Sequence, residues 1–255
     1  MSTLAALGLT PATAAGAAAA IAFAAVLRGF TGFGFALAAV PLASMFLPPS
    51  HVVATVLVMQ AAIGMRDCIV EFRQADWRAV LLMVGGSLFG TPLGVLALAA
   101  APLPLVRLAL GALVCLAVVV SWRPRPVVTR DGGRKALLAG FCSGVSNGLA
   151  AMAGPPAIIY FLAFQPRLAV MRSSLMVFFP LAALLALPMV AYSGLLGLGS
   201  VVLAIFLLPV MVLGGWLGAW AFRRFGHRSY RPFASAALLL TAAATIAKGI
   251  AELLP

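Results

Sequence analysis

Two glycine-rich strings hold the residues best suited to bind a substrate: Arg28–Phe35 (RGFTGFGF) and Gly140–Gly154 (GFCSGVSNGLAAMAG). Glycine and proline break helices in apolar segments, and a half-helix that begins at such a break exposes backbone N–H groups at the positive end of its dipole. Small polar side chains in these strings add hydrogen-bond donors without bulk: Thr31, Ser143, Ser146 and Asn147. We therefore expect a cavity that binds a small oxyanion, although close helix packing can also explain any single glycine.

Arginine and glutamine side chains stand beside these strings. Arg28 opens the first string and Arg172 follows the second, so either guanidinium can hold an anion by a bidentate contact or can simply mark a cytoplasmic helix end. Gln60 interrupts an apolar run, where it either faces the same cavity or forms an interhelical hydrogen bond. The candidate substrate-binding residues are Arg28, Gly29, Thr31, Gly32, Gly34, Gln60, Ser143, Ser146, Asn147, Gly154, Pro155 and Arg172.

The other reactive residues favour neither catalysis nor a metal site. Cys68, Cys115 and Cys142 stand apart without CxxC spacing, and the chain has no Walker A, HExxH or GxSxG motif. All five acidic residues fall in expected loops or at a terminus, so we expect no carboxylate deep in a bilayer to relay protons or bind sodium. We expect no enzyme, no cofactor and no metal. His51 is more simply an interface residue than a proton carrier, although proton coupling through it or through the substrate stays open.

The composition is that of a polytopic membrane protein. Apolar residues make up 64% of the 255 residues and charged residues only 9%, against roughly a quarter charged in soluble domains. Several stretches approach the roughly 20 apolar residues of a membrane span, among them Ala79–Ala101, Ser174–Leu198 and Val201–Phe222. The net charge of +12 comes from short basic clusters between apolar runs, which is the pattern of topology determinants rather than of nucleic-acid binding.

Eight hydrophobic elements divide evenly around a basic linker, 123–135. The expected elements are 12–47, 51–65, 79–101, 105–121, 136–164, 174–193, 199–221 and 232–252. Matches between the halves include GGSLFG with GGWLG and the two glycine-rich strings, each of which is followed by a proline. We therefore predict a first transmembrane repeat over 1–122 and a second over 136–255.

The positive-inside rule predicts how these repeats are oriented. Four clusters, 66–78, 123–135, 167–172 and 223–231, hold 14 of the 17 Lys and Arg residues, whereas the counterpart of 66–78 in the second half is uncharged. All four clusters are cytoplasmic only if the first element of each half crosses twice as two short arms, fully or as a re-entrant hairpin. The repeats are then inverted and both termini face outside, an arrangement typical of transporters with broken helices at the membrane midplane.

The chain resembles the TauE/SafE family of sulfite exporters and organosulfonate transporters in RGFTGFGFALAAVP, in GFCSGVSNGLAAMAGPPAIIYFLA followed by VMRSSL, and in the GGSLFG and GGWLG pair. The resemblance runs from about residue 12 to residue 250. It implies a duplicated transporter of the bacterial inner membrane for a small anion such as sulfite, thiosulfate or sulfoacetate. Residues that match the family's motifs are Gly29, Gly32, Gly34, Gly140, Gly144, Gly154, Pro155 and Pro156. The chain departs from the glycine-dense second motif where it reads SNGLAAMAG.

We therefore predict an all-α, multi-pass transmembrane bundle of two inverted repeats with broken or re-entrant helices rich in Gly and Pro. The predicted function is export of a small anion by alternating access at a midplane site, driven by the membrane potential as an electrical uniport. An anion channel and a metal or cation permease are the alternatives. The expected partners are the anionic substrate and the lipid bilayer, without nucleic acid; a homodimer is one assembly that the sequence leaves open.

Overall fold

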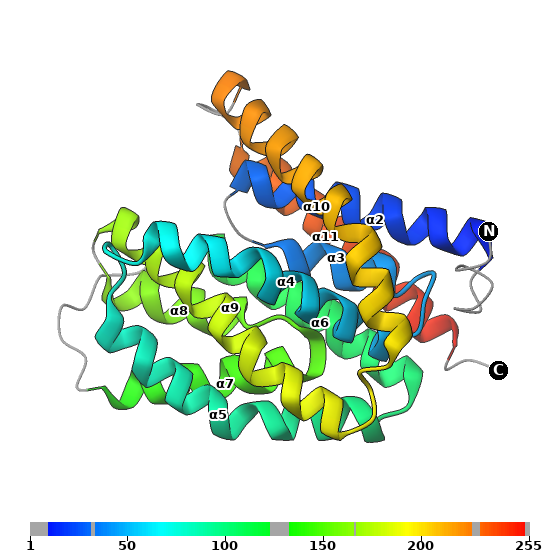
Figure 1. Ribbon diagram of the computed structural model, residues 1–255, viewed down its shortest axis with the longest axis horizontal. Coiled ribbons are helices and arrows are strands. Elements are labelled where there is room, and N and C mark those ends of the chain that lie inside the picture. Colours follow the sequence, from blue (N-terminus) through cyan, green and yellow to red (C-terminus); the bar gives the residue numbers. More distant parts are fainter. Residues whose placement is uncertain (1–9, 32–33, 123–132, 166, 226–229, 253–255) are drawn as a thin grey trace. The chain divides into compact units, whose positions relative to one another are not determined.

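The computed structural model describes residues 10–31, 34–122, 133–165, 167–225 and 230–252, and within these ranges all regular structure is helical (Figure 1). The helices are α2 (Pro11–Thr31), α3 (Phe35–Ala43), α4 (Pro49–Glu71), α5 (Trp77–Ala100), α6 (Leu103–Trp122), α7 (Arg134–Ala150), α8 (Gly154–Phe164), α9 (Leu168–Tyr192), α10 (Leu198–Phe225) and α11 (Tyr230–Ala251). The all-α prediction is confirmed for these residues.

The first element of each sequence half is a pair of helices. α2 ends at Thr31 before α3 begins at Phe35, and α7 ends at Ala150 before α8 begins at Gly154. Both breaks fall in the glycine-rich strings, where the sequence predicts short arms. The membrane crossing or re-entry of these arms, and the inverted orientation of the repeats, stay predictions.

Two helices extend well beyond the apolar elements that the sequence predicts. α4 runs on from residue 65 to Glu71, so the expected loop 66–78 shrinks to the residues between α4 and α5. α9 begins at Leu168 rather than at 174, which puts Arg172 inside the helix rather than at its start. Hydropathy marks the apolar stretch, but Arg and Glu are good helix formers and continue a helix past it.

The chain folds as two compact units, each built from both sequence halves. Unit 1 comprises Met1–Val56, Pro102–Cys115 and Gly197–Pro255, and unit 2 comprises Leu57–Ala101 and Leu116–Leu196. Unit 1 thus joins α2 and α3 to α10 and α11, whereas unit 2 joins α5 to α7, α8 and α9. The units do not coincide with the sequence halves, and the division of the sequence into repeats at the basic linker stays a prediction.

In unit 2, α5 and α7 lie side by side with their backbones in direct contact (Figure 1). A Cβ atom on Gly90 of α5 would lie 2.0 Å from the carbonyl oxygen of Phe141, and one on Gly144 of α7 would lie 2.7 Å from that of Ser87. The Ser87 hydroxyl donates to the carbonyl of Gly140 at 2.8 Å. Small residues permit such close approach, which supplies the packing attraction that holds helices together in lipid.

Unit 1 contains the same helix packing in the same register. A Cβ atom on Gly29 of α2 would lie 2.1 Å from the carbonyl oxygen of Gly215 and 2.9 Å from the nitrogen of Ala219 in α10. Residues of α2 correspond to residues of α7 at one constant difference in residue number, and residues of α10 correspond to residues of α5 at another. With these two differences, the close contacts of one unit match those of the other. The related contacts are Gly29–Gly215 with Gly144–Ser87, and Gly214–Ala22 with Gly86–Leu137. This recurrence supports an internal duplication.

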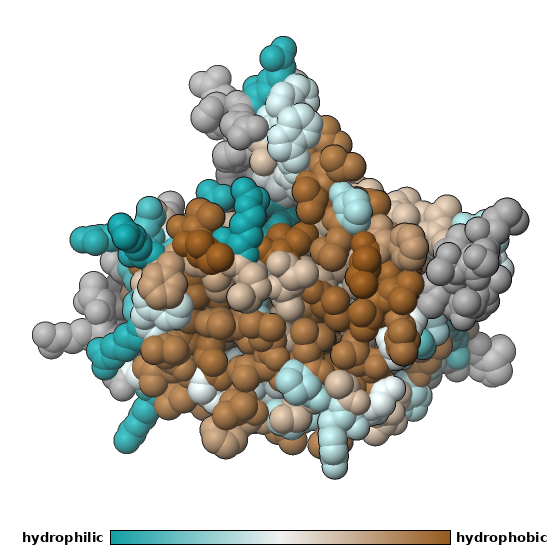
Figure 2. Space-filling model, in the orientation of Figure 1, coloured by the Kyte–Doolittle hydropathy of each residue, from teal (hydrophilic) through white to brown (hydrophobic). Residues whose placement is uncertain are grey.

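Large apolar side chains cover much of the surface. Figure 2 shows a broad apolar region over the face in view, and exposed residues such as Phe89 (70%) and Leu96 (60%) of α5 contribute to the apolar surface of the protein. Within the described residues, four helical segments are long and apolar enough to cross a membrane: Pro11–Gly29, Trp77–Ala100, Ala169–Tyr192 and Leu198–Ala221. Such exposed apolar surface on long apolar helices suits a lipid environment.

Candidate functional site

The break between α7 and α8 is a buried stretch of non-helical backbone in unit 2. Ala151 is only 1% exposed and adopts φ 54°, in the left-handed region that non-glycine residues rarely occupy. Its N–H donates to the carbonyl of Asn147 at 2.7 Å, which closes α7 with the αL motif. Strained backbone of this kind persists only where the surroundings hold it in place, and it gathers at functional sites.

Two amide side chains hold this break. Gln60 of α4 donates from Nε2 to the carbonyl of Ala151 at 3.0 Å. Asn147, 1% exposed, donates from Nδ2 to the carbonyl of Ala182 in α9 at 2.9 Å. The structure therefore brings together Gln60 and Asn147, which the sequence analysis proposed from separate halves of the chain. Both amides therefore donate to backbone carbonyls outside their own helices.

Two serine hydroxyls of α7 lie beside Asn147. Ser146 donates to the carbonyls of Cys142 and Ser143, each at 3.1 Å. Ser143 is completely buried, and its hydroxyl has no hydrogen-bond partner among the described residues. Ser143 lies one helical turn before Asn147, so both project from the same side of α7. A buried hydroxyl without a partner is costly unless it serves a ligand or water.

Gly154 and Pro155 begin α8 and are buried. From the sequence, a half-helix at this break is expected to expose unpaired backbone N–H groups, but Pro155 and Pro156 have none. Of the four donors that a helix start leaves unpaired, those of Ala153 and Gly154 remain. The positive end of the dipole is still directed at the break, so side chains rather than backbone must supply most of the donors.

The corresponding residues of the first string belong to unit 1. Arg28 is half-buried in the last turn of α2, where its charge suits the helix dipole, and Gly29 packs against α10. Gly34 is the N-cap of α3 with φ 90°, a conformation that favours glycine. Gly32 and the side chain of Thr31 lie outside the described residues.

Arg172 does not join the α7–α8 cluster. Its side chain is exposed, and it lies ten residues before Ala182 on α9, or about 15 Å along the helix. Its neighbours Ser173 and Ser174 instead bind the turn between α4 and α5. Ser173 donates to Glu71 Oε2 at 2.6 Å, and Ser174 accepts from the N–H of Asp76 at 2.8 Å.

These polar contacts were not expected from the sequence. Asp76 also caps α5 by accepting from Ala79 N–H at 3.2 Å, and Gln165 donates to its second oxygen at 3.3 Å. An Asp directly before an apolar helix is a recognisable N-cap signal. The serine partners carry no such signal, because nothing in the sequence brings the start of α9 to this turn.

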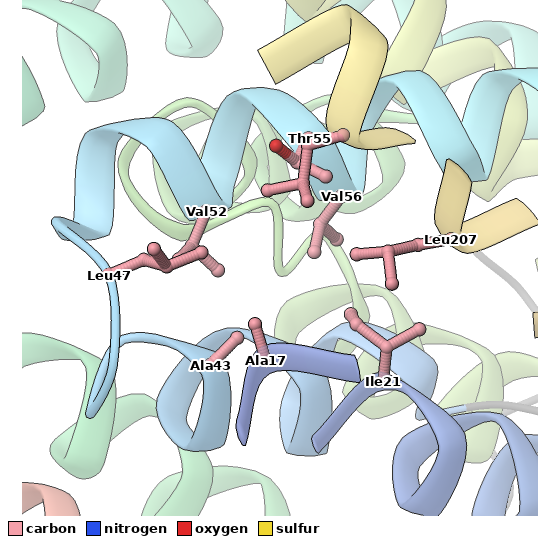
Figure 3. Close-up of a pocket in the computed structure, with 9 residues that line it drawn as sticks. Ala17, Ile21, Ala43, Leu47, Val52, Thr55, Val56 and Leu207 are labelled. Atoms are coloured by element: carbon pink, nitrogen blue, oxygen red, sulfur yellow. The ribbon is translucent and has the colours of Figure 1, made fainter. Parts of the chain in front are cut away.

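A small apolar pocket lies in unit 1. Figure 3 shows Ile21, Val52, Val56 and Leu207 converging on it from α2, α4 and α10, with Thr55 as its polar member. The Thr55 hydroxyl donates to the carbonyl of its own helix at His51, 2.8 Å away. With this lining the pocket has little to offer an anion.

An internal ion pair is the second feature that the sequence analysis missed. Arg107 of α6 is 5% exposed and pairs with Glu252, while its Nη2 donates to the carbonyl of Ser44 at 3.2 Å. The expectation that every carboxylate lies in a loop or at a terminus is wrong for Asp67 and Glu71, which lie in α4, and holds for Glu252, which follows α11. We did not expect Glu252 to have a buried partner, because α6, which carries Arg107, has a largely apolar sequence.

The described residues contain no group of three or more His, Cys, Asp or Glu side chains that could hold a metal ion.

A family model described as sulfite exporter TauE/SafE matches residues 17–245, nearly the whole chain. The chain belongs to the TauE/SafE family. No curated protein and no solved structure gives a significant match. TauE/SafE membership makes the chain one of a family of membrane exporters of sulfite and related anions, not of enzymes, and agrees with its apolar helices.

Proposed function

We propose that this TauE/SafE protein exports a small sulfur-containing or carbon-containing oxyanion, such as sulfite, thiosulfate or an organosulfonate, across the bacterial inner membrane by alternating access. The binding site that we propose is the α7–α8 break of unit 2. The observation that carries the proposal is the completely buried Ser143 hydroxyl, which has no hydrogen-bond partner in the described part of the chain and lies beside an amide that holds a broken, strained helix.

Side chains at the break can supply what an oxyanion needs. Ser143 has a free donor, and the Nδ2 of Asn147 and Nε2 of Gln60 each carry a second N–H beyond the bond that they make. Hydrogen bonds to a charged ligand are about twice as strong as those between neutral groups. An oxyanion can therefore bind the second N–H groups, and as the stronger acceptor it can also compete with the carbonyls of Ala151 and Ala182 for the first ones.

This competition gives a route to alternating access. When Asn147 donates to the carbonyl of Ala182, α7 is tied to α9. When Gln60 donates to the carbonyl of Ala151, α4 is tied to the break. An anion that takes over both donors releases both ties, so the bound state has a different set of helix contacts from the empty state. A ligand shifts a conformational equilibrium only through such a difference.

Net movement follows from charge. A membrane potential that is negative inside drives an anion outward by about 2.3 kcal/mol per charge per 100 mV. We therefore propose electrical uniport, consistent with the absence of any acidic side chain in the contacts that the described residues make at the break.

The test is thermal stabilisation of the purified protein by sulfite, thiosulfate, sulfoacetate, acetate, chloride and nickel, followed by flux into proteoliposomes. Ser143→Ala removes a buried hydroxyl that has no hydrogen-bond partner among the described residues, so we expect equal or higher stability in the absence of anion and a dissociation constant that is about tenfold weaker or more. Ser87→Ala is the matched control, because its hydroxyl is bound to Gly140 and its loss should lower stability without changing affinity.

Equal anion affinity in Ser143→Ala and the wild type would contradict our proposal that the anion binds at the α7–α8 break. Flux that rises linearly with concentration and never saturates would favour the channel alternative. A shift with nickel alone would favour the metal or cation permease.

A further inference from the structure

Charged side chains gather in unit 1 where α3, α6 and α11 approach one another, and we call Arg107, Lys248 and Glu252 the Arg107 cluster. Arg107 pairs with Glu252 and donates to the carbonyl of Ser44. Lys248 donates from Nζ to the carbonyl of Met45. Both cations therefore bind carbonyls that follow the end of α3, where the helix dipole is negative.

The cluster holds more positive than negative charge. It has two cations and one carboxylate, and the partial negative charge at the end of a helix is only about half an elementary charge. The Nε donor of Arg107 is also buried without a hydrogen-bond partner among the described residues. A buried guanidinium with an unused donor is costly in an apolar protein unless a ligand or water takes that donor.

The carboxylate is the exchangeable member of the cluster. The side chain of Glu252 is 32% exposed, whereas that of Arg107 is 6% exposed. Glu252 lies one residue beyond the end of α11, so its side chain can move without unwinding that helix. Gly249 brings α11 close to α6, because a Cβ there would lie 3.2 Å from the Cβ of Arg107. The cluster is therefore a preformed group of two cationic side chains, and a carboxylate of the same chain lies at its more exposed side.

We propose that the Arg107 cluster is a second anion-binding site, in which Glu252 occupies the place of a small oxyanion and gives way to one. The ligand class follows from the group already bound: a carboxylate, sulfonate or sulfite, with two or more oxygens on one centre, can match the fork of a guanidinium. Chloride cannot form that bidentate contact. This site lies in unit 1, and its residues are distinct from those of the α7–α8 break, so it does not depend on the proposed midplane site.

The experiment measures whether an added anion replaces the missing carboxylate. Glu252→Gln in the full chain should lower the melting temperature, and sulfite should then raise it by roughly 2–4 °C more than chloride at equal ionic strength. The wild type, whose own carboxylate already fills the site, should show a clearly smaller gain. The matched control is Glu71→Gln, which removes a carboxylate bound to Ser173 rather than to an arginine, and sulfite should raise its melting temperature no more than that of the wild type.

Two further variants keep the outcomes separate. Rescue by sulfite should persist in Ser143→Ala/Glu252→Gln, because the proposed transport site is not involved, and should be lost in Arg107→Gln/Glu252→Gln. The proposal is overturned if sulfite and chloride act equally on Glu252→Gln. It is equally overturned if Glu71→Gln shows the same rescue, or if Ser143→Ala abolishes it.

Discussion

Adding one methyl group at two nearby glycines of α5 should have opposite effects on stability. Gly85 and Gly90 both lie in the interior of this helix, where replacing glycine by alanine normally stabilises a protein by roughly 0.5–1 kcal/mol. A Cβ atom on Gly85 would meet only the Cδ2 of Leu137, at 3.8 Å, which is ordinary contact. A Cβ atom on Gly90 would lie 2.0 Å from the carbonyl oxygen of Phe141 in α7.

The close contact at Gly90 cannot be relieved by a side-chain movement, because the atom that it meets is backbone. Favourable non-bonded carbon contacts lie at roughly 3.5–4.0 Å, so α5 and α7 must separate by more than about 1 Å along much of their length. Overpacking of this kind costs about 1–3 kcal/mol. Gly90→Ala should therefore be destabilised by about 1–3 kcal/mol and Gly85→Ala should be stabilised by up to about 1 kcal/mol.

The assay is reversible unfolding of both variants in the same mixed micelles, followed by the fluorescence of the tryptophans. Gly29→Ala and Gly215→Ala extend the comparison to unit 1, since a Cβ on Gly29 would lie 2.1 Å from a backbone oxygen whereas one on Gly215 meets nothing within 4 Å. Equal stability of Gly85→Ala and Gly90→Ala would refute the direct backbone contact between α5 and α7. Unchanged stability of Gly29→Ala would refute the equivalent packing in unit 1.

Three other outcomes are expected. Ser173→Ala should lower the free energy of unfolding by about 1–3 kcal/mol, because Glu71 loses a charge-assisted hydrogen bond; an unchanged value would mean that this contact is absent in the bilayer. Asn147→Leu should reduce both stability and flux, since the buried carbonyl of Ala182 loses its donor; full flux at normal stability would contradict our proposed site. A potential of 100 mV should change the equilibrium distribution of a monovalent anion in proteoliposomes about 50-fold, and insensitivity to valinomycin-imposed potentials would exclude electrical uniport.

The breaks in the first helices could be predicted from sequence because their cause is local. Both breaks fall in the strings RGFTGFGF and SNGLAAMAGPP, where glycine and proline weaken the helix locally, although α5 continues through four glycines and Pro92 without a break. The ends of α4 and α9 were misjudged because hydropathy measures compatibility with lipid, whereas helix formation depends on backbone and rotamer entropy. The side chains of Arg66, Glu71 and Arg172 are unfavourable in lipid, but arginine and glutamate form helices readily.

The Arg107 cluster and the contacts of Ser173 and Ser174 could not be predicted, because they join segments that are far apart in the sequence. Arg107 looks like a helix-end residue after Pro102 and Pro104, and only the fold shows that α11 and the end of α3 meet it. The pairing of α5 with α7 was missed for the same reason. The matching GG motifs were visible as an echo, but a shared motif does not say which helix each copy contacts.

The glycines and the polar residues of α7 belong to two faces of one helix, which is why packing and binding need not be competing explanations. Gly140, Gly144 and Gly148 recur every fourth residue, and each would clash with the α5 backbone if it carried a Cβ. Asn147 precedes Gly148 by one residue, about a quarter of a turn away, and reaches α9 instead. The glycine face lets α7 pack directly on the backbone of α5. A helix held in this way on one face can present Ser143 and Asn147 in a constant position on the adjacent face, which the exchange of hydrogen-bond partners that we propose for α9 and the break requires.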